Sequence, residues 1–291
     1  MRSGFVAIVG RANVGKSTLL NSLMGEKISI VSEKAQTTRH RVLGVLHEEE
    51  GQIVLVDTPG MHKPRNELDH YMVDVIDDSL EGVDLLLFVV DASFEPGGGD
   101  RFMAERIENI RPKFLLLNKI DLLDDALFEK RLEEYKGIGT FDEIMGISAM
   151  YPPTTIGLKE KILSYLPEGP PYFPEEMKTD LDEDLVISEI VREKALMYLD
   201  EEIPHGIAVI VEEKEEINGV LHIMCTIIVE RESHKGIVIG KRGRKLKGIG
   251  KEARADLEKM YSQQVHLDLF VKVRKNWRSS SSRIVEYGYR R

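Results

Sequence analysis

Cysteine and tryptophan are nearly absent from this chain of 291 residues, which contains one of each. A single cysteine excludes an intrachain disulfide framework and a zinc site built from cysteines. Long apolar runs are also missing, because the longest, Leu85–Val90, is far shorter than the roughly 18 residues that span a bilayer. The N-terminal apolar stretch is too brief for a signal peptide, and no small-residue cleavage pattern follows it. We therefore expect a soluble protein of a reducing cytoplasm.

Charge is distributed unevenly along the chain, whose net charge is −10. Residues 231–291 hold 17 Lys and Arg against 6 Asp and Glu, so they carry +11 and leave −21 to the first 230 residues. The length fits about two domains. An asymmetry of this kind indicates that the basic part binds a polyanion.

The acidic part begins with a short apolar run and then "GRANVGKST", the pattern of a phosphate-binding loop between a strand and a helix. Glycines in such a loop let backbone N–H groups turn toward phosphates, and the lysine reaches the β- and γ-phosphates. The serine hydroxyl is suited to bind Mg²⁺. The alternative is a chance glycine-rich turn. The predicted loop residues are Gly10, Asn13, Val14, Gly15, Lys16, Ser17 and Thr18.

Three later motifs, each at the end of an apolar run, favour the nucleotide site over that alternative. "DTPG" offers Asp57 to Mg²⁺ through a water, and the Gly60 N–H to a γ-phosphate. "NKID" contributes Asn118, Lys119 and Asp121. The Asp121 carboxylate would accept from both N1–H and the 2-amino group of guanine, which adenine lacks, and a buried acceptor left unpaired costs about 1–3 kcal/mol. In "ISAM", a backbone N–H of Ser148 or Ala149 would meet the guanine 6-oxygen. The expected cofactors are therefore GTP or GDP with Mg²⁺.

This order of motifs resembles the translation-factor-related class of GTPases. The resemblance implies that "KAQTTRHR" is switch I and that Thr38 joins Ser17 and Asp57 as a Mg²⁺ ligand, with Thr37 as the competing assignment.

The residue after "DTPG" is Met61, where Ras-like proteins place a glutamine that orients the attacking water. A methionine cannot do so, and we therefore expect slow basal hydrolysis. Related GTPases without the glutamine use an asparagine at the position of Asn13 to help bind K⁺, which bridges the phosphates. The alternative role for Asn13 is stabilisation of the loop's turn. The catalytic residues expected on this basis are Lys16, Thr38, Gly60 and Asn13.

A proline-rich stretch, residues 169–180, separates a first domain, 1–168, from a second, 181–291. In the second domain a helical pattern from Leu181 precedes two strand-like runs joined at Asn218-Gly219, a hairpin signal. "GKRG" and a lysine-rich helical stripe follow (Leu246, Ile249, Ala253, Leu257 and Met260), and the last element is a strand. Strict alternation in the second run places Cys225 on its buried face.

This order of elements resembles a type II KH domain, whose GxxG loop clamps about four nucleotides of single-stranded RNA. The alternative is a solvated lysine-rich helix. Trp277 would either stack on a base or anchor the tail. The predicted RNA-binding residues are Ile239, Gly240, Lys241, Arg242, Gly243, Lys245 and Lys247.

Together the two halves resemble the Era family of bacterial ribosome-assembly GTPases over essentially the whole chain. The fold class is then α/β, a P-loop GTPase domain with a doubly wound, mostly parallel sheet, followed by an α+β type II KH domain. The resemblance implies GTP hydrolysis, binding to the 3′ end of 16S rRNA in the 30S precursor, a role in rRNA maturation, a monomer, and peripheral contact with the cytoplasmic membrane. Two alternatives are an RNA-binding assembly factor with a structural nucleotide, and a tRNA-modifying GTPase, for which no cofactor-binding segment is left over.

Overall fold

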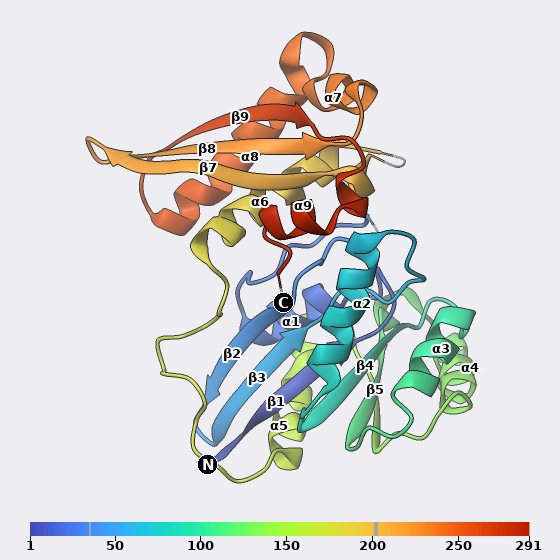
Figure 1. Ribbon diagram of the computed structural model, residues 1–291. Coiled ribbons are helices and arrows are strands. Elements are labelled where there is room, and N and C mark those ends of the chain that lie inside the picture. Colours follow the sequence, from blue (N-terminus) through green and yellow to red (C-terminus); the bar gives the residue numbers. More distant parts are fainter. Residues whose placement is uncertain (35, 201–202, 291) are drawn as a thin grey trace. The chain divides into compact units, whose positions relative to one another are not determined.

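The computed structural model describes residues 1–34, 36–200 and 203–290 (Figure 1). The chain divides into two compact units, one of residues 1–64 and 69–180 and the other of residues 65–68 and 181–291. Each unit has its own sheet and core, and each is described by itself below.

The first unit is built on a six-stranded sheet in the order β2-β3-β1-β4-β5-β6. All neighbouring strands run parallel except β2, which is antiparallel to β3. The strands are β1 (Arg2–Val9), β2 (Val42–Glu48), β3 (Gly51–Asp57), β4 (Leu85–Asp91), β5 (Lys113–Asn118) and β6 (Glu143–Gly146). The chain places β2 and β3 on one side of β1 and β4, β5 and β6 on the other. Ligands of doubly wound sheets bind at the carboxyl edge beside such a change of direction.

Helices cover both faces of this sheet. Residues of α2, α3 and α4 share a core with β1, β4 and β5, in which Ile76, Met103 and Tyr135 pack against Phe88 and Leu117. Helices α1 and α5 lie on the opposite face (Figure 1). The helix bounds are α1 (Lys16–Met24), α2 (Glu67–Leu80), α3 (Gly98–Arg106), α4 (Asp125–Lys136) and α5 (Ile156–Tyr165).

The proline-rich stretch after α5 adheres to the first unit as extended chain. The side chain of Gln52, on β3, donates to the carbonyl of Phe173 at 2.8 Å and accepts from the N–H of Tyr172 at 2.7 Å. The N–H of Val45, on β2, donates to the carbonyl of Lys178 at 2.8 Å. Residues 172–178 are therefore fastened along β2 and β3 and do not form a free tether.

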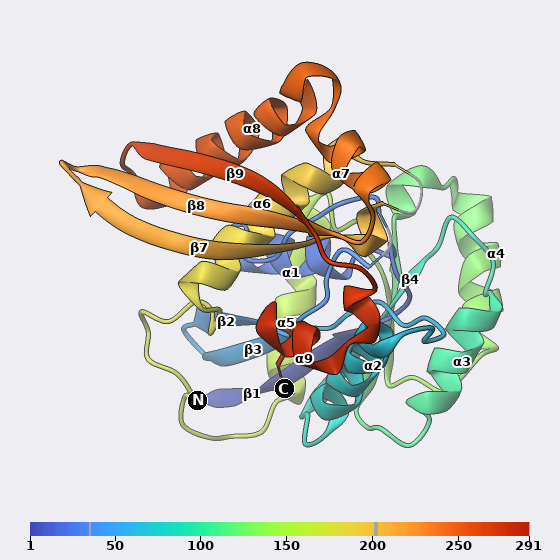
Figure 2. The ribbon, with the colours of Figure 1, turned by 45° about the horizontal axis from the view of Figure 1, so that its top comes forward.

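The second unit places helices on a three-stranded sheet ordered β7-β8-β9, in which β8 is antiparallel to β7 and parallel to β9. Its elements are α6 (Glu183–Tyr198), β7 (Ala208–Ile217), β8 (Val220–Val229), α7 (Glu232–Ile239), α8 (Arg244–Tyr261), β9 (Val265–Val273) and α9 (Ser281–Glu286), and Figure 2 shows them from a second direction. The predicted hairpin is confirmed, because Asn218 and Gly219 join β7 to β8 with φ values of 53° and 77°. Both central residues of a type I′ turn need such positive angles.

Burial in the second unit agrees with most of the predicted pattern. Cys225 is fully buried, and burial raises the pKa of its thiol to about 12. Of the two roles expected for Trp277, the structure supports the anchor: it is fully buried, its Nε1 donates to the carbonyl of Gly206 at 2.9 Å, and its ring packs on Tyr287 and Tyr289.

Two expectations for this unit were wrong. Met260 does not belong to the apolar stripe of α8, because 42% of its surface is exposed. The chain also forms α7 before the GxxG loop, where the sequence suggested that the loop follows a strand directly. Among the described residues no helix is both long and apolar enough to cross a membrane.

Candidate nucleotide site and candidate RNA groove

The predicted phosphate loop connects β1 to the amino end of α1, and its glycines are required sterically. At Gly15, φ is 99°, and an added Cβ would lie 2.3 Å from the side-chain nitrogen of Asn118. At Gly10 an added Cβ would lie 2.3 Å from the carbonyl oxygen of Val89. A side chain at either position would push the loop off the sheet.

Lys16 is buried at the centre of this loop. Its Nζ donates to the backbone carbonyls of Gly10, at 3.2 Å, and Arg11, at 2.9 Å. Burial lowers the pKa of Lys16 from 10.5 to about 8, against the opposing attraction of the Asp57 carboxylate. A phosphate beside this ammonium group would supply negative charge and raise its pKa again.

The three predicted Mg²⁺ ligands lie together. The hydroxyl of Ser17 is 2.7 Å from that of Thr38 and donates to Asp57 Oδ2 at 2.6 Å. The hydroxyl of Thr37 instead donates to the carbonyl of Lys34 at 2.6 Å, so the geometry favours Thr38 over Thr37.

The donor set also fits a hard cation. Asp57 is fully buried, burial raises its pKa, and its Oδ1 has no hydrogen-bond partner among the described residues. Two hydroxyls and a carboxylate are oxygen ligands of the kind that Mg²⁺ prefers, with waters and phosphate oxygens completing the coordination.

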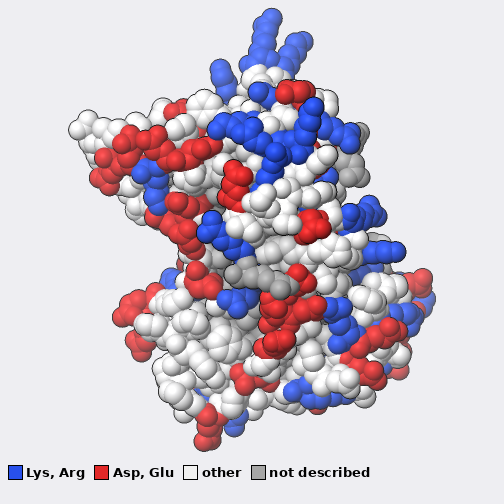
Figure 3. Space-filling view, viewed as in Figure 1, with Lys and Arg blue, Asp and Glu red and all other residues white. Residues whose placement is uncertain are grey.

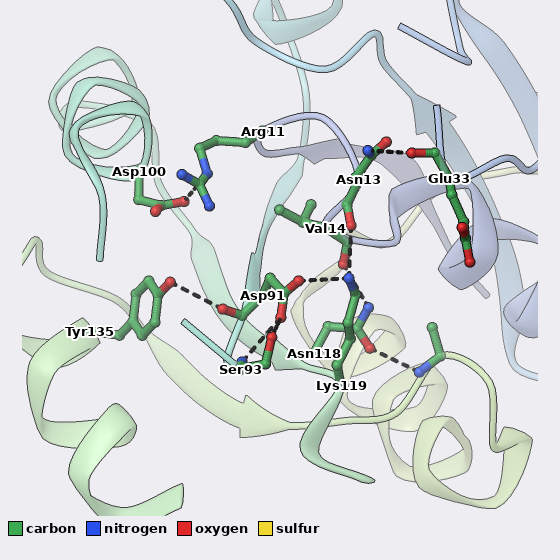
Figure 4. Close-up of polar contacts among 11 residues, drawn as sticks. Arg11, Asn13, Val14, Glu33, Asp91, Ser93, Asp100, Asn118, Lys119 and Tyr135 are labelled. Atoms are coloured by element: carbon green, nitrogen blue, oxygen red, sulfur yellow. Dashed lines mark hydrogen bonds and ion pairs between the residues drawn. The ribbon is translucent and has the colours of Figure 1, made fainter. Parts of the chain in front are cut away.

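Asn118 connects the phosphate loop to the "SA" motif (Figure 4). Its Nδ2 donates to the carbonyl of Val14 at 2.7 Å, and its Oδ1 accepts from the N–H of Ala149 at 2.9 Å. The N–H of Ser148 donates to the hydroxyl of Thr154 at 3.0 Å. Both N–H groups expected to meet the guanine 6-oxygen thus donate within the chain, and a base oxygen would share or replace one of these bonds. Sequence reasoning did not identify Thr154.

The other guanine-motif residues differ in exposure. Lys119 has φ of 67° and donates from Nζ to the carbonyl of Asn13 at 2.9 Å, so it holds the phosphate loop from the side. Asp121 lies in a short 3-10 helix, Ile120–Leu122, and its side chain is exposed to solvent, where an incoming base can reach it.

The surroundings of Met61 agree with the absence of a water-orienting glutamine. Met61 is buried in the core with Phe88 and Ile76. Its N–H donates to the carbonyl of Gly10 at 3.2 Å. Asn13 has φ of 64°, and its Nδ2 donates to the carbonyl of Glu33 at 2.7 Å, which links the phosphate loop to the start of the predicted switch I (Figure 4).

The GxxG loop lies between α7 and α8. Gly240 and Gly243 have φ values of 71° and 75°, and Arg242 between them has 54°. Lys241 and Arg242 are exposed. Figure 3 shows Lys and Arg side chains gathered at the upper end of the second unit, where α7 and α8 lie.

A groove of about 330 Å³ lies between α8 and β9. It contains the predicted residue Lys247 together with residues that sequence reasoning missed, and its lining is Leu246, Lys247, Gly250, Lys251, Arg254, His266, Leu267 and Leu269. Cationic residues come from the helix, and His266 adds an aromatic ring from the strand. A signal was present in the sequence, because Lys247, Lys251 and Arg254 recur at helical spacing.

Two predicted RNA-binding residues have other contacts. The Nζ of Lys245 donates to the carbonyl of Tyr198 at 3.0 Å, so this ammonium group caps the carboxyl end of α6. Ile239 is half-buried against the core of the second unit.

Comparison with known proteins follows the same division of the chain. Residues 5–119 match the family described as "50S ribosome-binding GTPase", and residues 202–278 match "KH domain". "GTPase Era" of Alkaliphilus metalliredigens is 48% identical over 291 residues, which are 99% of each chain. "GTPase Era" of Clostridioides difficile is 50% identical over 293 residues, covering 99% of this chain and 98% of the relative.

Two solved structures are similar over 99% of both chains. An Era in complex with MgGDPNP and nucleotides 1506–1542 of 16S ribosomal RNA has a TM-score of 0.94 at 43% identity. A variant of Aquifex aeolicus Era bound to GDP·AlF₄⁻ has a TM-score of 0.95 at 43% identity. The predicted fold class, a P-loop GTPase domain followed by a KH domain, is confirmed.

Proposed function

The chain belongs to the Era family of GTPases, and on that premise we propose that it is a GTP-hydrolysing switch that binds the 3′ end of 16S rRNA during assembly of the 30S subunit. The observation that carries this proposal is the likeness, along nearly the whole chain, to an Era that holds both MgGDPNP and a segment of that RNA.

In the proposed nucleotide site, Lys16 neutralises the β- and γ-phosphates, and the turned backbone of the phosphate loop donates N–H groups to them. Ser17 and Thr38 would bind Mg²⁺ directly and Asp57 would bind it through a water, and the metal ion would neutralise charge on the phosphates. The Gly60 N–H would donate to the γ-phosphate and hold it for attack by water.

We propose that the hydrolysis rate is low because Met61, the residue after "DTPG", cannot orient the attacking water. Burial of Met61 and the bond between Asn13 and the carbonyl of Glu33 support this reading. In one version Asn13 helps bind K⁺ beside the phosphates, and in the other it fixes only the turn of the loop. Phosphate release measured in potassium and in sodium buffers distinguishes them: faster turnover in potassium that is lost in Asn13→Ala supports the first. Equal rates for both proteins in both buffers support the second.

A second candidate function is an RNA-binding assembly factor whose bound nucleotide is structural and is hardly turned over. The burial of Met61 is the observation that favours it. Multiple-turnover phosphate release that RNA or ribosomal particles stimulate would argue for the switch. Release that stops at one phosphate per protein would argue for the structural nucleotide.

We propose that the GxxG loop and the groove between α8 and β9 hold single-stranded RNA. The backbone at Gly240 and Gly243 would approach the RNA backbone closely, while Lys241, Arg242 and Lys251 would neutralise phosphates. Release of counterions then makes binding weaken as salt rises, with a slope of about −0.7 per phosphate neutralised on single strands.

Switching requires that the two sites be coupled. If RNA favours the GTP state, GTP must raise RNA affinity by the same factor as RNA raises GTP affinity, typically about 5- to 150-fold. The test is to titrate a 16S 3′-end oligonucleotide into protein saturated with GDP or with GDPNP. Equal RNA affinities in the two states would leave binding intact but exclude the switch.

The cellular setting is part of the proposal. We propose a cytoplasmic monomer that acts on the 30S precursor and contacts the inner face of the membrane peripherally. Crosslinking of the GTP-bound protein in cells, followed by sequencing of the attached RNA, tests the ribosomal target. Sedimentation equilibrium tests the monomer, and flotation with anionic vesicles tests the membrane contact.

A further inference from the structure

Two buried carboxylates lie beside the nucleotide site and outside all of its motifs. Asp91 ends β4, and Asp100 lies in the first turn of α3; their exposed fractions are 6% and 0%. Each faces a cationic side chain that is connected to the phosphate loop (Figure 4). Neither carboxylate has a role in the function proposed above.

Asp91 holds Lys119 by a short contact. Its Oδ2 accepts from Lys119 Nζ at 2.6 Å, and its Oδ1 accepts from the N–H and the hydroxyl of Ser93 at 3.0 and 2.5 Å. The same ammonium group donates to the carbonyl of Asn13 at 2.9 Å. Lys119 therefore forms a bridge from the end of β4 to the middle of the phosphate loop.

Asp100 pairs with Arg11, a residue of the phosphate loop itself. Asp100 Oδ1 lies 3.1 Å from Arg11 Nε, and Asp100 Oδ2 accepts from the N–H of Gly97 at 2.9 Å. Burial raises the pKa of Asp100, while the Gly97 N–H and the Arg11 guanidinium favour its charged form. This pair joins the loop to the amino end of α3.

The glycines before Asp100 make room for Arg11. An added Cβ at Gly99 would lie 2.6 Å from Arg11 Cδ, and one at Gly97 would lie 2.9 Å from Arg11 Nη1. An added Cβ at Gly98, between them, would meet nothing within 4 Å. None of the three has a positive φ, so backbone conformation does not explain them. The segment from Asp91 to Asp100 therefore contacts both cationic side chains. Asp91 binds Lys119, and Gly97, Gly99 and Asp100 accommodate Arg11.

We propose that Asp91 and Asp100 are positioning residues for guanine-nucleotide binding, which hold the outer side of the phosphate loop through Lys119 and Arg11. The inference rests on the proposed function, because it assumes that this loop binds GDP and GTP. A loop that is ordered before the nucleotide arrives loses less conformational entropy on binding. Loss of either contact should therefore speed GDP release and raise the KM for GTP while kcat changes little. Discrimination between GDP and IDP should not change, since neither carboxylate touches the base.

The adjacent glycines supply a matched experiment on the full-length protein. GDP release is measured with a fluorescent GDP chased by excess unlabelled GDP. We expect Gly99→Ala to release GDP about tenfold faster, equivalent to about 1.4 kcal/mol, because it displaces Arg11. Gly98→Ala should release GDP at the wild-type rate. In an Arg11→Ala background, Gly99→Ala should have no further effect, since the side chain it displaces is gone. A purely structural role for Gly99 predicts the opposite, its full effect in both backgrounds, and that result overturns the Arg11 arm of the proposal.

The Asp91 arm is tested by a double-mutant cycle. Asp91→Asn should speed GDP release about tenfold in the wild-type background and have no further effect beside Lys119→Met. Asp77→Asn is the control, because Asp77 pairs with Arg106 of α3 at the surface, where both side chains are partly exposed. The proposed role of Asp91 is overturned if Asp91→Asn releases GDP at the wild-type rate. It is also overturned if the effects of Asp91→Asn and Lys119→Met on GDP release are additive. A wild-type protein that binds no GDP would refute the proposed function instead, so the two failures are distinguishable.

Discussion

The pKa of Lys16 provides a quantitative test of the nucleotide site. Burial lowers it to about 8 in the free protein. Phosphate groups beside the ammonium would hold it protonated, so nucleotide binding takes up a proton above about pH 8. The affinity for GDP should then fall about tenfold between about pH 7 and about pH 9, because the fraction of free protein with charged Lys16 falls by that factor.

The assay is a titration of fluorescent GDP at each pH, with Lys16→Arg as the control. An arginine stays charged over the whole pH range. This variant should therefore bind GDP more weakly than the wild-type protein, but residue 16 should cause no loss of its affinity as pH rises. The guanine base begins to lose its own N1 proton in alkaline solution, and this loss affects both proteins equally. The difference between the two curves therefore isolates Lys16.

The stability of the nucleotide-free protein should change in the opposite direction. A lysine whose folded pKa is lowered destabilises the fold below that pKa, and the cost disappears as pH rises toward the unfolded value of 10.5. The shift of 2.5, from 10.5 to about 8, corresponds to about 3 kcal/mol. Relative to Lys16→Arg, the free energy of unfolding of the wild-type protein should rise with pH above about 8, while its GDP affinity falls. Parallel curves for the two proteins in both assays would refute the reasoning.

Three further predictions concern other parts of the chain. Gly15→Ala should weaken GDP binding at least about tenfold, because it strains φ and displaces Asn118. Gly25→Ala is the control and should leave GDP affinity unchanged, because Gly25 has a positive φ but no neighbour within 4 Å of an added Cβ. Equal GDP affinities in the two variants would contradict this prediction. Trp277→Phe should lower the free energy of unfolding of the second unit by about 1–3 kcal/mol in urea denaturation, since it leaves the Gly206 carbonyl unpaired, and an unchanged midpoint would show that this bond does not matter. Lys251→Gln should reduce the salt slope of RNA binding by about 0.7 in filter-binding titrations, and an unchanged slope would exclude a phosphate contact there.

The sequence predicted well where the motif residues lie, because strand ends carry them. In a parallel sheet the carboxyl ends of strands meet at one edge, so Asp57 at the end of β3 and Asn118 at the end of β5 lie near each other without further information. The short loops leave those residues little freedom. The sequence did not predict the hydrogen-bond partners of the motif residues within the chain. One example is the hydroxyl of Thr154, which accepts from the N–H of Ser148.

The missed helix α7 shows tertiary packing prevailing over local preference. "GIVI" before the GxxG loop is rich in β-branched residues, which favour strands. In the structure Val238 is fully buried in the core with Val229 of β8 and Leu257 of α8. Burial of an apolar side chain contributes about 1.5–3 kcal/mol, more than the few tenths that helix propensity costs at each residue. A local pattern of a few residues does not contain that information.

The groove between α8 and β9 could not be predicted because it depends on how a helix lies on a strand. Lys251 and Arg254 share a helical face, but only the fold brings His266 and Leu269 opposite them. The sequence contains the charge, and the structure adds the apolar floor and the ring on which a base can stack.

The three glycines before Asp100 show how a distant residue can dictate local composition. Consecutive glycines suggest a turn that needs positive φ, and here none has it. Two of them are explained by Arg11, which lies more than 80 positions earlier and packs where their Cβ atoms would be. If positioning of the phosphate loop is the reason for this arrangement, a side chain at Gly99 should be harmless once Arg11 is removed, although the backbone there is unchanged. Backbone entropy predicts the same small gain in stability for alanine at Gly98 and Gly99, and only the steric argument separates the two.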